Sequence, residues 1–223
     1  MPASPGSGRR GRGLACPAVV QGLLACLVRR SVTGKGGEVE TSLLEALLDL
    51  QFEVLTTHLN DGGRLPARSG FRSAHAYLAA PYGVYRTLDG WLALAMTPLA
   101  KLAPLLGVDD LAAIATDPTA GFTRRDEIKR LIADRLATGT TAQWLAALQP
   151  SDVWCADLLD WKRLLANEDF TSLDMLQTVT RSDGVTIRTT RVPLRVDGVR
   201  PRIVHAAPRI GEHTQALMQE FSL

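Results

Sequence analysis

The apolar residues of this chain recur mainly at helical spacing. The strongest pattern spans residues 42–59, where leucine and valine side chains fall on one broad face. Ser42 and Glu45 open it with the Ser-x-x-Glu spacing of a capping box. An Asn-Asp-Gly-Gly run at 60–63 follows, and such residues end helices. The pattern therefore predicts one helix from Ser42 to about Leu59.

Further helices are predicted along the rest of the chain. The clearest covers residues 124–138, where Ile128, Leu131 and Ile132 share a face and Gly139 marks the end. Weaker patterns predict helices at 17–30, 97–106, 109–116, 141–149, 157–165 and 211–221.

Short stretches of alternating or β-branched residues predict strands between these helices. They lie at 38–41, 83–87, 91–95 and 153–156, with two or three more within 175–196. Leu88-Asp89-Gly90 predicts a tight hairpin, because Asp-Gly suits the turn. Residues 64–79 have no sustained period and predict a loop. The expected fold class is mixed α/β (α+β).

Composition places the chain among globular proteins. Of its 223 residues, 46% are hydrophobic and 22% are charged, which is enough apolar material for a core. A net charge of +2 is too small to indicate nucleic-acid binding. The three cysteines Cys16, Cys26 and Cys155 lack metal or redox spacing, which favours a reducing compartment such as the cytoplasm.

The first residues are basic and poor in large apolar side chains. Residues 1–16 contain mainly Pro, Ser, Gly and Arg, and we expect a disordered leader, although a basic tail can also bind phosphate or RNA. Arginines followed by the apolar run 14–28 also resemble an export signal, and Leu-Leu-Ala-Cys at 23–26 is near a lipoprotein cleavage pattern. The run is too short to span a bilayer, and it suits a core helix equally well, so no membrane contact is expected.

Enzyme motifs are lacking in the sequence. It contains no Gly-x-Ser-x-Gly, phosphate-binding Walker loop, dinucleotide fingerprint or His/Cys metal cluster. The run Gly34-Lys35-Gly36-Gly37 has backbone amides that suit a phosphate, but it precedes a predicted strand, so a plain turn is the simpler interpretation. The residues alone indicate a helix-rich mixed domain without a visible active site or metal.

Four segments in order resemble one known family. They are TGKGGEVETSLLE at 33–45, APYGVYRTLDGW at 80–91, VWCA at 153–156 and APRIGEHT at 207–214. Their residues and their order are similar to those of the family III CoA-transferases, the carnitine, formyl-CoA and bile-acid type also called CaiB/BaiF-like. The resemblance runs from about Val20 to the C-terminus. In that family these segments belong to the back half of the chain, so we expect a truncated protein.

The resemblance implies a reaction whose nucleophile this sequence lacks. In the family an aspartate carboxylate attacks the thioester carbonyl of an acyl-CoA, a mixed anhydride forms, CoA thiolate leaves, and the acyl group is exchanged with an acceptor acid. The position of this aspartate corresponds to a place near Arg12 in the present sequence. The run Arg-Arg-Gly-Arg-Gly at 9–13 contains no acidic residue. A guanidinium does not act as a nucleophile. Related racemases take their bases from the same missing half. We therefore expect no catalytic residue here and no activity of the chain alone.

The resemblance also implies a domain organisation. Residues 59–172 correspond to the family's small domain, and 17–58 and 173–223 to incomplete pieces of its Rossmann-like large domain. Family members form interlocked dimers, so the expected partner is a second copy or a chain that supplies the N-terminal half. Two other hypotheses stay open: a non-catalytic acyl-CoA-binding or regulatory partner of a full-length CoA-transferase, and a degenerate gene product without a stable fold.

The candidate substrate-binding residues follow from the same resemblance. In the family a mobile, often glycine-rich loop before the hairpin folds over the active site. The matching loop here offers Arg68, Gly70, Arg72 and His75, and Tyr82 follows as a pocket residue. We expect them to contact the acyl-CoA, which is a substrate rather than a cofactor. The alternative is a solvated basic loop and a core tyrosine.

Overall fold

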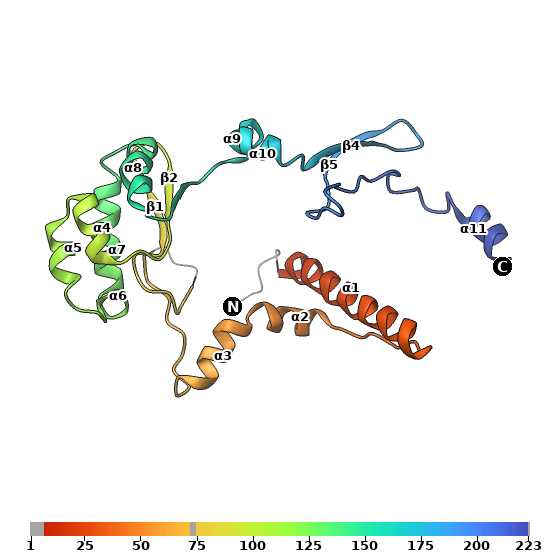
Figure 1. Cartoon of the computed structure of the whole chain (residues 1–223), viewed down its shortest axis with the longest axis horizontal. Helices are drawn as coiled ribbons and strands as arrows, with labels where there is room; N and C mark the ends of the chain where they lie inside the picture. Colours follow the sequence, from red (N-terminus) through yellow and green to blue (C-terminus); the bar gives the residue numbers. More distant parts are fainter. Residues whose placement is uncertain (1–6, 72–74, 223) are drawn as a thin grey trace. The chain divides into compact units, whose positions relative to one another are not determined.

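The computed structural model of this chain describes residues 7–71 and 75–222. They divide into two compact units, one that ends at Asp157 and one from Leu158 onward (Figure 1). Helices and small antiparallel sheets are both present, so the mixed α/β class is confirmed. The predicted domain boundaries at residues 58 and 172 stay a prediction.

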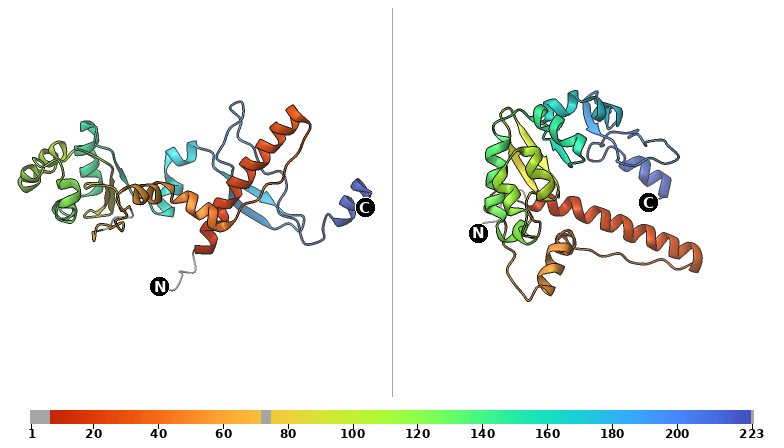
Figure 2. Two further views of the ribbon diagram at one scale, coloured as in Figure 1. Left: turned by 90° about the horizontal axis from the view of Figure 1, so that it is seen from below. Right: turned by 60° about the vertical axis from the view of Figure 1, so that its left-hand side comes forward.

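The first helix is longer than predicted. Helix α1 spans Ser7–Thr33 and runs continuously through Pro17 (Figure 2). The disordered leader expected over 1–16 is therefore wrong from Ser7 onward, and residues 1–6 lie outside the described structure. Arginine, alanine and leucine between Ser7 and Pro17 favour helix, but the glycines at 8, 11 and 13 oppose it, so local propensity does not account for the extension. The proline inside the helix removes one backbone donor without ending it here. No helix in the described part of the chain is long and apolar enough to cross a membrane.

The segment after α1 is extended but is not a strand. The predicted strand 38–41 is wrong, because an extended segment needs a neighbouring strand for its ladder and none pairs with it in the described structure. The segment instead packs against α1. A Cβ on Gly22 would lie 2.6 Å from Val39 Cγ1, so Gly22 lets the valine approach the helix.

The predicted helix 42–59 is two helices, α2 (Leu43–Leu50) and α3 (Phe52–Asn60). The capping box is confirmed: the Glu45 backbone N–H donates to Ser42 Oγ at 3.2 Å, and the Ser42 N–H donates to Glu45 Oε2 at 2.7 Å. The break lies at Gln51, whose φ and ψ are −99° and 10°. Glutamine is an ordinary helix former, so the local sequence carries no signal for this break.

The core of the first unit is a small sheet with helices around it. Strands β1 (Gly83–Arg86), β2 (Trp91–Leu94) and β3 (Cys155–Asp157) pair antiparallel in the order β1-β2-β3. The helices that gather around it are α4 (Leu99–Leu106), α5 (Asp109–Ile114), α6 (Ala120–Thr123), α7 (Arg125–Leu136) and α8 (Thr141–Leu148), followed by a 3₁₀ turn at Gln149–Ser151 (Figure 1). The sequence predicts all of these except α6 and the 3₁₀ turn.

Helix α7 contributes one continuous row of buried side chains to this core. Ile128, Ile132 and Leu136 recur every four residues, as the helical period requires, and have no exposed surface. They belong to the same cluster as the sheet residues Leu92 and Leu94. The predicted apolar face of this helix is confirmed.

The hairpin is fixed to the start of α8 by its Asp-Gly turn. Asp89 Oδ1 accepts hydrogen bonds from the Thr141 backbone N–H at 2.8 Å and from Thr141 Oγ1 at 3.0 Å. The backbone bond from Thr141 is the main cause that lowers the pKa of Asp89. Thr87 Oγ1 lies 2.7 Å from Thr141 Oγ1. The turn thus serves as a side-chain cap for a helix more than fifty residues away.

The second unit contains α9 (Trp161–Ala166), α10 (Glu168–Ser172), β4 (Leu176–Thr180), β5 (Thr186–Thr190) and α11 (Thr214–Phe221). Strands β4 and β5 form one antiparallel hairpin (Figure 2). At its turn Asp183 accepts from Arg181 Nε at 2.8 Å and from Arg209 Nη2 at 2.7 Å. The two arginines lower the pKa of Asp183. Two of the strands predicted within residues 175–196 are therefore present.

A matched pair of leucine variants tests where the core lies. Leu106 is fully buried in the core cluster, whereas Leu59 is 71% exposed. We expect Leu106→Ala to lower the free energy of unfolding by about 3 kcal/mol, since it removes buried carbon and leaves a cavity. Leu59→Ala, the control, is expected to change it by less than about 0.5 kcal/mol. Chemical denaturation measures both. Equal losses would contradict this placement of the core.

Candidate functional site

The loop between α3 and β1 is held by the first turn of α7. Arg125 Nη1 donates to the carbonyl oxygens of Ala76 at 2.8 Å and Leu78 at 3.4 Å. Its Nη2 donates to the Ala67 carbonyl at 2.7 Å. One guanidinium therefore binds both ends of the predicted substrate loop, and it satisfies carbonyl groups that have no strand or helix partner.

Asp126, the next residue of α7, binds the middle of the same loop. Its carboxylate accepts from Ser69 Oγ and from the Gly70 backbone N–H, the latter at 3.2 Å. The hydrogen bond from Ser69 is the main cause that lowers the pKa of Asp126. A Cβ on Gly70 would lie 3.2 Å from Asp126 Oδ2, so glycine permits this close approach. The carboxylate is fully engaged in holding the loop.

Lys129, one turn further along α7, is buried, and no acidic side chain among the described residues forms a hydrogen bond with its amine. Its side chain is 1% exposed, and its Nζ has no hydrogen-bond partner among the described residues. Burial lowers its pKa, the charge of Arg125 lowers it further, and Asp126 opposes both. A Cβ on Gly83 would lie 3.4 Å from both Lys129 Nζ and Tyr85 Oη, so the bare glycine of β1 makes room for the amine.

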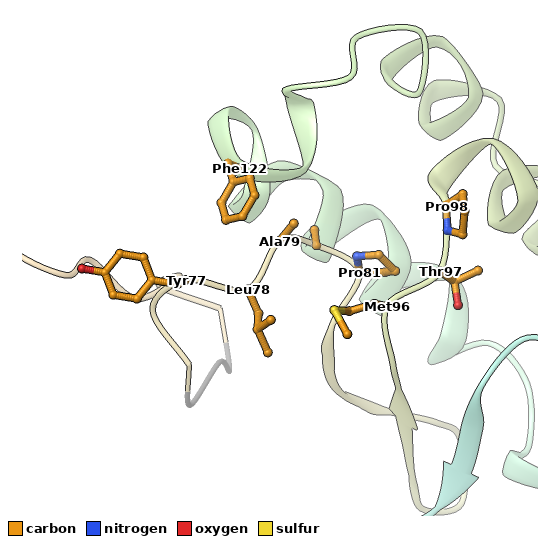
Figure 3. Close-up of a pocket in the computed structure, with 9 residues that line it drawn as sticks. Tyr77, Leu78, Ala79, Pro81, Met96, Thr97, Pro98 and Phe122 are labelled. Carbon is orange, nitrogen blue, oxygen red and sulfur yellow. The ribbon is translucent and has the colours of Figure 1, made fainter. Parts of the chain in front are cut away.

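An apolar groove of about 500 Å³ opens beside this loop (Figure 3). Its wall is formed by Tyr77, Leu78, Ala79, Ala80, Pro81, Met96, Thr97, Pro98 and Phe122. These residues come from the end of the loop, from the start of α4 and from α6 (Figure 3). None of these described lining residues is charged. The groove therefore suits an apolar chain or ring rather than an ionic group.

A buried tyrosine binds the backbone of Pro81, a residue of the groove wall. Tyr85 is 2% exposed, and its Oη donates to the Pro81 carbonyl at 2.5 Å. Burial raises the pKa of Tyr85, so the phenol stays neutral and acts as a donor. The hydrogen bond ties β1 to the residue that enters the groove.

The structure places the predicted loop residues in different surroundings. Gly70 lies against Asp126, as described above. His75 Nδ1 accepts from the Tyr77 backbone N–H at 3.2 Å, and its Nε2 is 3.7 Å from Glu53 Oε1 of α3. Arg68 is exposed and makes no hydrogen bond or ion pair with another described residue. Arg72 lies outside the described residues.

Tyr82 is half-buried next to the groove's Pro81, and its backbone N–H donates to the Ala79 carbonyl at 3.2 Å. The structure brings Gly70 and His75 into one pinned loop, but it does not bring the side chains of Arg68 or Tyr82 into the groove wall. A substrate contact for these residues stays a prediction.

The sequence pattern missed the residues that shape this site. Arg125, Asp126 and Lys129 lie on the best-predicted helix of the chain, where charges usually indicate a solvated face. Lys129 does carry a signal, because it sits between Ile128 and Ile132 on the apolar side. Phe122 stands in the single-turn helix α6 and Met96 in the segment between β2 and α4, and helical spacing identifies neither. Among the described residues no cluster of His, Cys, Asp or Glu is suited to a metal ion.

Comparison with known proteins identifies the family. The sequence profile of CoA-transferase family III matches residues 14–214, which is most of the chain. An acyl-CoA transferase from Fusarium pseudograminearum is 26% identical over 211 residues, covering 90% of this chain and 45% of its own length. A succinate–glutarate CoA-transferase from Agrobacterium fabrum is 24% identical, covering 91% of this chain and 51% of its own. The chain belongs to CoA-transferase family III.

Solved structures show the same fold. A protein from Mycobacterium tuberculosis matches 88% of this chain and 51% of its own, with a TM-score of 0.66 and 23% identity. A CAIB/BAIF family protein from Brucella suis matches 87% of this chain and 50% of its own, with a TM-score of 0.63 and 22% identity. The chain thus spans about half the length of the relatives that it matches.

The role of Arg125 is tested by removing its guanidinium. We expect Arg125→Gln to release the loop at 67–78, because a single amide does not bind carbonyls at both ends of it. Limited proteolysis and amide hydrogen exchange should then show faster cleavage and exchange in this loop. Arg130→Gln, an exposed neighbour on the same helix, is the control. An unchanged loop in Arg125→Gln would refute the clamp.

The burial of Lys129 predicts a stabilising substitution. Lys129→Met keeps the length of the side chain and removes the unpaired amine, so we expect the free energy of unfolding to rise by about 1 kcal/mol or more. The folded-state pKa of Lys129 is lowered, so the unfolded chain binds more protons between that pKa and 10.5. The free energy of unfolding of the wild type therefore rises with pH across that window. The difference between its free energy of unfolding and that of Lys129→Met becomes smaller.

Denaturation of both proteins at several pH values measures this gap. Arg130→Met, on the exposed side of α7, is the control and should show no such pH-dependent difference. A loss of stability in Lys129→Met at every pH would show that the amine has a bonded partner.

Proposed function

We propose that these 223 residues act as the C-terminal part of an acyl-CoA:carboxylate CoA-transferase. In this role they form the scaffold and an apolar substrate groove, while the carboxylate that carries the acyl group comes from a protein segment outside them. Membership of CoA-transferase family III supports the reaction class. The coverage of about half of each relative supports the division of labour.

The observation that carries this proposal is the absence of an acidic residue from the described groove wall. The family's reaction needs a carboxylate that attacks the thioester carbonyl and expels CoA thiolate, leaving a mixed anhydride. Near the groove, Asp126 is occupied by Ser69 and Gly70, and Asp61 accepts from Tyr77 Oη at 3.1 Å. Carboxylates that accept such hydrogen bonds are poor nucleophiles, because the bonds stabilise their charge.

The apolar wall gives the groove a role in substrate binding. Tyr77, Met96 and Phe122 offer an aromatic and thioether surface to the carbon chain of an acyl or pantetheine group. Van der Waals contact over such a surface binds a carbon chain without selecting one particular acyl group.

The exposed apolar surface of α1 is evidence that another protein segment covers it. Val20, Leu23, Leu24 and Leu27 are each more than half exposed. Contiguous exposed apolar side chains favour association with another protein surface. We propose that this surface is covered by the part of the family's fold that these residues do not contain, in the same chain or in a partner, including a second copy.

The proposed compartment is the cytoplasm. The three cysteines form no disulfide bond in the described structure, and their spacing suits a reducing environment.

A second candidate function is a non-catalytic one. The same uncharged groove favours a module that binds acyl-CoA, or that regulates a full-length CoA-transferase, without reacting. The two candidates differ in whether an added N-terminal half creates activity.

Reconstitution separates these functions. We expect the purified chain alone to transfer no CoA from succinyl-CoA to glutarate, and we expect turnover when it is co-expressed with the N-terminal half of the Agrobacterium relative. Transfer of CoA is followed by chromatography of the thioesters. The N-terminal half alone is the control.

Turnover by the purified chain alone would overturn the proposal. A change in the rate of a full-length transferase on mixing, with no gain from the N-terminal half, would replace it with the regulatory function.

A further inference from the structure

The second unit contains a polar, positively charged groove, unlike the uncharged apolar groove of the first unit. It has a volume of about 470 Å³. Its wall is formed by Leu176, Gln177, Thr178, Arg188, Arg202 and Ile203. Polar side chains dominate this wall, two of them guanidinium groups, and no described lining residue is acidic.

Strand pairing and one side-chain bond bring these residues together. In the β4–β5 hairpin Thr178 stands opposite Arg188, and opposed residues share a face of the sheet. Arg202 arrives from the segment after β5. That segment is attached to β4 because the Ile203 backbone N–H donates to Gln177 Oε1 at 3.0 Å.

The polar groups left without a partner in this groove are hydrogen-bond donors. The amide of Gln177 is not accessible from the groove, because its carbonyl oxygen accepts from Ile203, its Nε2 is buried, and its side chain alternates with that of Thr178 along β4. Arg188 and Arg202 are exposed and make no hydrogen bond or ion pair with any described residue. The site therefore has donors and positive charge but lacks an acceptor.

Asp174, a carboxylate whose pKa is lowered in part by Arg202, already has an ion-pair partner. The charge of Arg202 helps to lower the pKa of Asp174, but the main cause is the hydrogen bond from Arg191. Arg191 is 5% exposed and forms an ion pair with the Asp174 carboxylate. Asp174 is thus held by a buried partner outside the groove wall, and it leaves Arg188 and Arg202 available for an external anion.

We propose that this groove binds an oxyanion through the guanidinium groups of Arg188 and Arg202. Guanidinium groups bind phosphate and carboxylate oxygens with two parallel hydrogen bonds, which gives both strength and orientation. Two sources share this chemistry, and both rest on the proposed function: the phosphate groups of CoA and the carboxylate of the acceptor acid. The binding itself does not depend on catalysis.

Direct binding to the full 223-residue chain tests the proposal. The probes are inorganic phosphate, free CoA and glutarate, titrated at constant ionic strength. Binding is followed by calorimetry and by the side-chain N–H resonances of Arg188 and Arg202. We expect saturable binding of at least one probe, with a shift of these resonances. Preference for phosphate and CoA assigns the phosphate source, and preference for glutarate assigns the carboxylate source.

Arginine variants locate the site. Arg188→Gln and Arg202→Gln should each raise Kd about tenfold or more, because each removes charge-assisted hydrogen bonds. Arg188→Lys, which keeps the charge without the paired donors, should fall between Arg188→Gln and the wild type. The control is Arg195→Gln, an exposed arginine of the same unit that donates to the Gly198 carbonyl at 3.4 Å.

Several outcomes would overturn the inference. They are no shift of the Arg188 and Arg202 resonances with any probe, or the same Kd in Arg188→Gln, Arg202→Gln and Arg195→Gln. The two proposals fail separately. Oxyanion binding without reconstituted transfer would remove only the proposed function. Reconstituted transfer without oxyanion binding would remove only this site.

Discussion

The first unit depends on the two-sided character of helix α7. One side of the helix buries Ile128, Ile132 and Leu136 in the core, and its first turn presents Arg125 and Asp126 to the preceding loop. The core packing fixes the position of the helix, and the helix then fixes the loop through hydrogen bonds to its backbone. The groove wall continues from that loop, so its shape follows from the same packing.

Some polar groups in this arrangement are buried, and their desolvation costs free energy of folding. Lys129 lies on the inner side of α7 without a hydrogen-bond partner among the described residues, and Tyr85 keeps its proton and donates to Pro81. An apolar residue at position 129 would pack without a desolvation cost. The second unit carries a different kind of buried group, the Gln177 amide nitrogen, which has no hydrogen-bond partner among the described residues.

Local signals predicted much of the fold. Ser42 and Glu45 form their capping box, and Asp89-Gly90 forms the hairpin turn, because a few neighbouring residues determine each of these. The features that failed depend on distant contacts or on their absence. The extended residues 38–41 have no neighbouring strand in the part of the chain that the structure describes, and the helix break at Gln51 has no local cause. The site was predicted least well, since Arg125 binds carbonyls about fifty residues away and sequence spacing contains no trace of that contact.

The location of the acyl-carrying carboxylate tests the central claim most directly. An active assembly that contains this chain should be incubated with an acyl-CoA, quenched, and digested for mass spectrometry with and without hydroxylamine, which cleaves acyl anhydrides. The account predicts a hydroxylamine-sensitive acyl adduct on an aspartate outside these 223 residues. An adduct on an acidic side chain within them would contradict it.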